Sequence, residues 1–422
     1  MASQNPPFAP LVLASLCVAI SASAQSGDRS LEDRVRALEQ SAQSRGEQDS
    51  PSPERRGLTD LGQTTMFDSA FNPAISVIGD FVFAGTDRDD NFERHNQFLL
   101  RDVELGFVGR VDPSISYQVY VHFDESDIEL EEAFVLADDW LPDTFQLKAG
   151  RYNVDFGKLS SVHDHDLPFV DKPQVLQDYL GGSLRGTGLE LHHYFEVGDA
   201  TLVRWSAGIV NGLDGDSHAV FGPAADHDHG DGGVEPFGDR DFANFGYSGR
   251  ISALADVGES GTLQVGASVA WAPAARAFYE SGMTVVSVDL ASTIVGADVL
   301  YKTLDAETGA GTSIGAELLH ADTEHSDDGM AVTKSHAFGF YGYAEQLVNR
   351  NWSFGASGGH FQHAEDDAEE SWDAGLFVTH RLNEFNRLRV EVRRFDDPVE
   401  DSIGLLLQWT VILGSHGHGI DW

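Results

Sequence analysis

Cysteine is almost absent from this 422-residue chain, and the one present is Cys17. It lies in an N-terminal apolar segment that we expect to be removed, so the mature protein would carry none. This excludes disulfide frameworks, cysteine-ligated zinc sites and thiol catalysis, and it fits an exported protein.

Basic residues are also scarce. Lys and Arg total 27 against 68 Asp and Glu, which gives a formal net charge of −41. A chain of this charge repels the phosphates of nucleic acid, so no nucleic-acid partner is expected. It attracts cations instead.

Long hydrophobic runs are missing as well. Outside the N-terminus no stretch of about 18 apolar residues occurs, which excludes spanning helices. A membrane β-barrel passes this test, because each of its strands shows lipid only every second residue. The 44 glycines and 10% aromatic residues suit closely packed strands with aromatic girdles.

The N-terminus reads as a signal peptide over residues 1–24. Residues 11–20 form an apolar core too short to span a membrane, and Ala22-Ser23-Ala24 is a small-x-small cleavage site. The segment before Leu11 has no Lys or Arg, which is unusual. Bulky Leu16 before Cys17 argues against a lipoprotein.

Residues 25–45 predict a short periplasmic coiled-coil helix. Leu31, Val35, Leu38 and Ala42 follow one another at 4-3-4 spacing, which is under two heptads of a coiled-coil seam. It could hold three chains together as a homotrimer, or it could be an amphipathic helix without a partner. Residues 46–73 read as a linker, and residues 415–422 as a periplasmic tail.

From residue 74 to residue 414, segments with period-2 alternation recur at lengths that suit tilted membrane strands. They predict an all-β fold, a transmembrane antiparallel β-barrel of about 16 strands. The expected strands are 74–86, 98–112, 115–125, 128–138, 145–157, 186–197, 200–212, 244–257, 261–274, 290–304, 311–324, 335–348, 352–364, 371–383, 386–396 and 402–414.

The connections between these segments alternate in length. Turns such as Asp112-Pro113-Ser114 are short, whereas 158–185 and 213–243 are long and charged. Short periplasmic turns and long outer loops are typical of outer-membrane barrels. The alternatives are a soluble β-sandwich, which seldom has sixteen long strands, and a propeller, whose blade repeat is missing.

Three groups of residues carry a family resemblance: residues 71–80, Leu130-Glu131-Glu132-Ala133-Phe134-Val135 with Lys148-Ala149-Gly150-Arg151, and the most distinctive, His163-Asp164-His165-Asp166-Leu167-Pro168-Phe169-Val170-Asp171. The chain resembles the phosphate-selective type of Gram-negative porin, which has a coiled coil and a sixteen-stranded barrel. It looks closer still to the branch labelled zinc-regulated or TonB-dependent outer-membrane receptors. However, residues 25–73 are too few for the plug of such receptors. The resemblance implies the outer membrane of a Gram-negative bacterium and lipid, lipopolysaccharide and small solutes or metal ions as partners.

Charged residues on the strands are expected to line the pore, because each would cost about 2–4 kcal/mol on the lipid face near mid-membrane. The adjacent Glu131 and Glu132 can both face inward only at a bulge. Lys148 and Arg151 would both line the pore only with a bulge in the fifth strand. The walls would either set a transverse field or form ion pairs that stabilise a polar interior. The pore-lining candidates are Asp102, Glu104, Asp124, Glu129, Glu131, Glu190, Arg387, Arg389 and Arg393.

Histidines gather in the predicted outer loops or at their edges, namely His95, His163, His165, His218, His227, His229, His325, His336 and His363. Imidazole with carboxylate suits Zn²⁺ and other divalent ions. No cofactor is required, but a weakly bound Zn²⁺ or similar cation is expected in these loops, unless they are only solvated surface. The metal candidates are His163, His165, Asp226, His227, Asp228, His229 and Asp231.

The sequence therefore predicts an outer-membrane porin for passive diffusion, favouring cations or divalent metals concentrated by the outer loops. The alternative is a general or anion-selective porin. A structural barrel without conductance is a further possibility, recognised by loops that fold inward. An enzyme is not expected, since Ser371 and His380 lie nine residues apart on one strand, too far to touch at about 3.3 Å per residue.

Overall fold

The computed structural model describes residues 73–87, 96–125, 128–137, 141, 144–198, 200–213, 241–258, 260–281, 284–326, 330–398 and 401–414. The predicted signal peptide, coiled coil, linker and C-terminal tail lie outside these residues. Among the described residues, no helix has both the length and the apolar character needed to cross a membrane.

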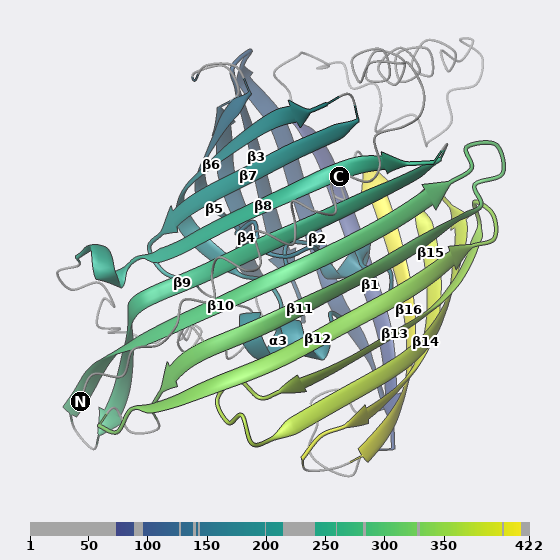
Figure 1. Cartoon of the computed structure of the whole chain (residues 1–422). Coiled ribbons are helices and arrows are strands. Elements are labelled where there is room, and N and C mark those ends of the chain that lie inside the picture. The colour runs from purple at the N-terminus through teal and green to yellow at the C-terminus, as the bar shows by residue number, and fades with distance from the viewer. Residues whose placement is uncertain are drawn as a thin grey trace.

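Sixteen antiparallel strands, β1 to β16, close into one barrel in which each strand pairs with its sequence neighbours and β1 pairs with β16 (Figure 1). The strand count and the fold class predicted from the sequence are confirmed. The strands are β1 (Ala74–Thr86), β2 (Gln97–Asp112), β3 (Ile115–Phe123), β4 (Ile128–Ala137), β5 (Phe145–Asn153), β6 (Arg185–Val197), β7 (Thr201–Val210), β8 (Gly246–Val257), β9 (Gly261–Ser281), β10 (Thr284–Leu304), β11 (Gly311–His325), β12 (Thr333–Leu347), β13 (Trp352–Gln362), β14 (Glu370–Asn383), β15 (Asn386–Asp396) and β16 (Asp401–Gly414).

Alternation sorts the side chains of each strand between lipid and lumen. In β16, Ile403, Leu405 and Trp409 are exposed on the outer face. Gln408 and Thr410, on either side of Trp409, are buried on the inner face. One apolar and one polar face per strand is what a barrel in lipid requires, because the lumen accepts polar groups and lipid does not.

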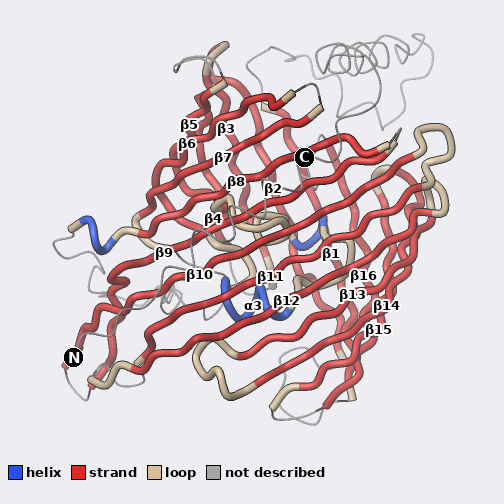
Figure 2. The backbone as a smooth tube through the Cα atoms, viewed as in Figure 1, coloured by secondary structure: helices blue, strands red, loops and turns tan. Residues whose placement is uncertain are grey.

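Strand β5 is shorter than the sequence predicted and ends at Asn153 rather than at residue 157. The chain then leaves the sheet and returns only at Arg185. We call residues 154–184 the inner loop, because the chain folds back into the barrel instead of projecting outward (Figure 2). It contains the 3-10 helix η2 (Asp164–Asp166) and the helix α3 (Gln174–Leu180). A further 3-10 helix, η3 (Phe242–Asn244), precedes β8.

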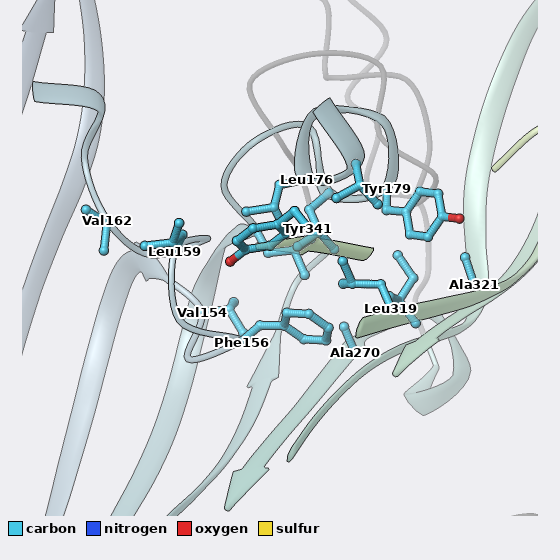
Figure 3. Packing of buried hydrophobic residues seen from close by; sticks show 14 of the residues in the cluster. Val154, Phe156, Leu159, Val162, Leu176, Tyr179, Ala270, Leu319, Ala321 and Tyr341 are labelled. Atoms are coloured by element: carbon cyan, nitrogen blue, oxygen red, sulfur yellow. The ribbon is translucent and has the colours of Figure 1, made fainter. Parts of the chain in front are cut away.

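The hydrophobic core lies where the inner loop packs on the inside of the barrel. Phe156, Leu176 and Tyr179 of the loop are fully buried. They pack against Leu319 of β11 and Tyr341 of β12, which face the inside of the barrel (Figure 3). The loop and the facing strands thus form a packed apolar cluster inside the barrel, and this cluster fixes the path of the loop.

Two glycines make the path of the loop possible. Gly157 has φ +59, and a Cβ there would lie 2.1 Å from Glu317 Oε1 on β11. Its N–H donates to Ser268 Oγ on β9 at 3.0 Å. Gly181 ends α3 in the left-handed conformation, with φ 62. Glycine is favoured at both positions, because it alone lacks a Cβ that would clash or be strained.

Candidate functional site

The lumen at the level of the inner loop is the candidate functional site, because charged side chains from several strands converge there. The loop contacts β2, β15 and β11 through side chains on each of them. Any solute that crosses the barrel must pass this layer.

Two β-bulges turn additional charges inward. In the β3–β4 ladder the register shifts so that Tyr120 pairs with Glu132 and Val121 with Leu130, which leaves Glu131 as the extra residue. The bulge predicted for Glu131 and Glu132 is therefore confirmed. A second shift, between β1 and β2, leaves Arg101 as the extra residue beside Asp102. Both Arg101 and Asp102 are buried.

Arg101 is a lumen residue that the alternation of the sequence did not predict. Its Nε donates to Asp80 Oδ2 at 2.9 Å, and its Nη1 donates to the carbonyl of Val170 and to Asp171 Oδ1, each at 2.8 Å. One guanidinium thus joins β1 to the inner loop. Neighbouring charged residues within one membrane strand, Arg101 and Asp102, were the signal that could have revealed it.

The predicted acidic wall divides between the barrel interior and its outer rim. Glu104 and Glu190 are 0% exposed, and Asp102 is also buried. Glu129 is half-buried and pairs with Arg185 at 2.7 Å. Asp124 lies exposed just beyond the end of β3 at Phe123, so it is not part of the strand that was expected to carry it, and its position in the lumen stays a prediction.

Lys148 and Arg151 reach acidic partners without the bulge expected in the fifth strand. The β4–β5 ladder runs in unbroken register past both residues. Lys148 Nζ lies 3.3 Å from Glu190 Oε1. Arg151 Nη2 lies 3.4 Å from Glu129 Oε1. Of the two roles considered for the wall charges, a transverse field or stabilising ion pairs, these contacts favour ion pairs.

The predicted basic wall lies on β14 and β15. Arg389 and Arg393 are buried in the lumen, and Arg387 is half-buried beside them. Arg393 Nε donates to Glu391 Oε1 at 2.6 Å. The register places Arg381 of β14 directly opposite Arg387 of β15.

Three of these arginines make few direct ion pairs. Arg389 donates to the loop carbonyls of Leu167 and Phe169 and to two neutral side chains, and Arg387 donates to Thr410 Oγ1. Within the described part of the chain, the only carboxylate in ion-pair reach of Arg381, Arg387 and Arg389 is Glu345, 3.7 Å from Arg381 Nη2. The arginines on this side of the lumen are therefore only partly neutralised by direct ion pairs, although Asp80 and Asp166 act on Arg387 electrostatically, as Glu345 and Glu391 do on Arg389.

Two of the metal candidates are not at the pore mouth. His163 and His165 belong to the inner loop and are buried against β2 and β4. Burial alone lowers the pKa of His163, but Glu131 and hydrogen bonds to Glu104, Glu131 and Glu132 raise it well above its usual value. The expectation that these two histidines lie in a solvated outer loop is wrong, because the loop that carries them is too apolar to remain in water. The other metal candidates, Asp226, His227, Asp228, His229 and Asp231, lie outside the described residues, as do His95 and His218.

A serine–histidine–aspartate chain forms where α3 meets the β13–β14 connection. His363 Nδ1 lies 2.8 Å from Asp178 Oδ2, and His363 Nε2 lies 2.8 Å from Ser371 Oγ. The histidine that Ser371 contacts is therefore His363, not His380. Because Ser371 is 6% exposed, a substrate carbonyl has no room to approach its oxygen in this conformation. These hydrogen bonds hold α3 against the β13–β14 connection. A further bond strengthens this contact, because Ala364 N donates to Asp178 Oδ1 at 2.8 Å.

Comparisons with known proteins agree with a porin-like barrel. Residues 78–240, fewer than half of the chain, match the family model of phosphate-selective porins O and P. An uncharacterized protein of Aquifex aeolicus is 29% identical over 144 residues, which cover 29% of this chain and 30% of that protein. The chain therefore spans less than a third of the length of this curated relative.

Two solved structures show the same fold. A loop L8 deletion mutant of OmpT, an outer-membrane protein of Vibrio cholerae, has a TM-score of 0.51 at 10% identity, with 82% of this chain and 100% of that chain covered. An anion-selective porin from Comamonas acidovorans has a TM-score of 0.50 at 9% identity, with 81% and 99% covered. With the partial family match, these likenesses identify the chain as a porin-like β-barrel of the Gram-negative outer membrane.

Proposed function

We propose that this protein is a porin that admits small solutes by passive diffusion and favours anions at the level of the inner loop. The observation that carries the proposal is the direct cross-strand pairing of Arg381 and Arg387 on the lumen side. Like charges placed opposite each other are destabilising. An anion that passes between them relieves the repulsion.

The net charge of −41 suggested cation preference, yet selectivity is set where the path is narrowest. There, many carboxylates are engaged by cations from the wall, as in Arg101–Asp80 and Arg250–Asp298. By contrast, the hydrogen bonds of Arg387 and Arg389 on β15 go to neutral groups, and Arg381 on β14 has only Glu345 at 3.7 Å as an ion-pair partner among the described residues. The anion selectivity stated for the Comamonas porin and the phosphate-selective family match agree with this assignment.

Planar-bilayer recordings under a salt gradient test the proposal. We expect a reversal potential of the sign that marks anion preference, reduced by the double variant R381Q/R387Q. The control is R394Q, which removes one arginine charge from the outer face of β15, where Arg394 pairs with Asp401; the single variants R381Q and R387Q are compared with it charge for charge. Cation preference in the unmodified protein, or no conductance, contradicts the proposal.

The homotrimer and the loop-borne zinc capture stay predictions. Both depend on segments outside the described residues, namely 25–45 and 225–232. Light scattering of the detergent-solubilised protein gives the number of chains per particle. Conductance with and without added Zn²⁺, repeated on a chain lacking residues 225–232, tests whether these loops concentrate the ion at the pore entrance.

A further inference from the structure

A cluster of imidazoles and carboxylates lies buried between the inner loop and the wall formed by β2 and β4. His163 Nδ1 lies 2.9 Å from Glu104 Oε2 and 3.1 Å from Glu131 Oε2. His165 Nδ1 lies 3.5 Å from Asp102 Oδ2. The β3–β4 bulge brings the carboxylate of Glu131 to this place.

Glu104 belongs to two sets of three potential ligands within this cluster. One set is Asp102, Glu104 and His165, and the other is Glu104, Glu131 and His163. In each set the ligand atoms lie within 4.8 Å of one another. A tetrahedral ion with bonds of about 2.0–2.2 Å separates its ligand atoms by roughly 3.3–3.5 Å. The separations from His163 to Glu104 and Glu131, 2.9 and 3.1 Å, and from His165 to Asp102, 3.5 Å, are near that value, and side-chain movements of up to about an ångström would complete a coordination shell.

The charge of the cluster also favours a bound cation. Asp102, Glu104, Glu131 and Glu132 bring four carboxylates into a buried space. A buried carboxylate is costly unless it is paired or coordinates a metal ion. Arg185 offsets one charge, since its Nη2 lies 3.2 Å from Glu131 Oε1. The remaining negative charge can be balanced by protonated histidines, or by a divalent ion that binds in place of the histidine protons.

Surrounding groups hold the carboxylates in place. Asn153 N donates to Glu132 Oε1 at 2.6 Å. His122 Nδ1 lies 3.0 Å from Asp102 Oδ1, on the side away from His165. Partners of this kind orient metal ligands and fix their geometry.

We propose that this cluster binds a divalent transition-metal ion of the Zn²⁺ class, with Glu104 as the central ligand and the imidazoles of His163 and His165 as ligands from the loop. Imidazole nitrogen with carboxylate oxygen suits this class of ion. The ion joins the inner loop to the β2–β4 wall and stays in the barrel. It is therefore a resident ion, separate from any solute that permeates and from capture by the outer loops.

The test measures metal binding by the full-length protein in detergent. The barrel is treated with a chelator, dialysed, and titrated with Zn²⁺ alone, or with Co²⁺, whose visible absorption reports imidazole and carboxylate ligands. We expect binding of at least one ion per barrel, weakened at least about 100-fold in E104Q and in H163Q/H165Q, because a directly coordinating group is lost. The absence of uptake by the unmodified barrel overturns the proposal.

A matched control is H320N/H336N. These two exposed histidines flank Asp322 on the β11–β12 hairpin, so they form a histidine–carboxylate cluster at the surface. We expect this variant to bind the ion like the unmodified protein. Loss of binding in H320N/H336N together with full retention in E104Q assigns the ion to the surface and overturns the buried site.

Folding of each variant is checked by the heat-dependent shift in electrophoretic mobility that closed barrels show. Should E104Q not fold, the Co²⁺ spectrum of the unmodified protein decides: a spectrum without imidazole ligation overturns the proposal. Because metal content is measured apart from conductance, failure of this proposal and failure of the anion-porin proposal are distinguishable.

Discussion

Arg389 Nη1 donates a hydrogen bond to the backbone carbonyl of Phe169 across 2.6 Å, and this bond fastens the inner loop to β15. Nη2 of the same guanidinium donates to the carbonyl of Leu167 at 2.8 Å. Arg389 is 2% exposed. The loop therefore cannot move away from β15 without leaving a buried cation short of two hydrogen bonds.

The variant R389M should release the loop, because methionine keeps an unbranched side chain and removes both bonds. Hydrogen bonds to charged groups contribute about 1.5–3 kcal/mol each, so the loss of two should make departures of the loop roughly 10²- to 10⁴-fold more frequent. We expect larger and noisier single-channel currents. R394M, on the outer face of the same strand, serves as the control. Unchanged currents in R389M would show that these bonds do not hold the loop.

The tether of α3 to His363 should depend on pH. The hydrogen bond to Asp178 raises the pKa of His363, with burial opposing and the charges of Asp178, Glu369 and Asp397 adding to the rise. Because the raised pKa favours the protonated form in the folded state, the stabilisation is complete below the unfolded value of about 6.5. It is lost as the pH rises through the folded pKa.

Limited proteolysis of the inner loop measures this effect across that range. We expect faster cleavage as the pH increases, and in H363Q a cleavage rate that changes little with pH once the activity of the protease is corrected for. A pH dependence that is the same in H363Q as in the unmodified protein would assign it to other groups.

The Asp178–His363–Ser371 chain should be inert toward serine-reactive reagents. Its hydrogen-bond order is that of a hydrolase triad, but the serine is buried. We expect no labelling by a fluorophosphonate probe, in the unmodified barrel or in S371A. Labelling that disappears in S371A would instead reveal a nucleophile and would contradict the purely structural role.

The sequence predicts the barrel well because the alternation of lipid and lumen side chains is local. The bounds of β1, Ala74–Thr86, were predicted without error, and β16 has the apolar stripe expected of it. The need for a bulge at Glu131 and Glu132 could also be foreseen, because adjacent residues of a regular strand face opposite sides, and one of the two carboxylates would otherwise face lipid. The bulge at Arg101 carried the same kind of signal beside Asp102 and was missed.

The inner loop could not be placed from its sequence, because its position depends on contacts with strands far away in the chain. Val170 N, for example, donates to Glu391 Oε2 of β15. Its composition did hold a signal, since Leu167, Phe169 and Val170 are unusual in a solvated loop. That signal indicates burial without identifying the burying surface. The contacts of His163 and Arg389 in the lumen depend on where the inner loop lies. The alternation of the sequence therefore could not predict them.

The outer face of β14 offers a test of how the barrel lies in lipid. Leu376 is 69% exposed near the middle of the strand, on the side away from the lumen. Arginine at mid-membrane on the lipid face costs about 2–4 kcal/mol, and near the interface about 0–1 kcal/mol. Reversible folding into lipid vesicles, followed by denaturant titration, should therefore show a large loss of stability for L376R. The control is L413R, because Leu413 is 60% exposed one residue from the periplasmic end of β16, and its loss should be small. Equal losses in the two variants would mean that the hydrocarbon layer is not centred on the middle of the strands, and a gain in L376R would mean that this face does not meet lipid.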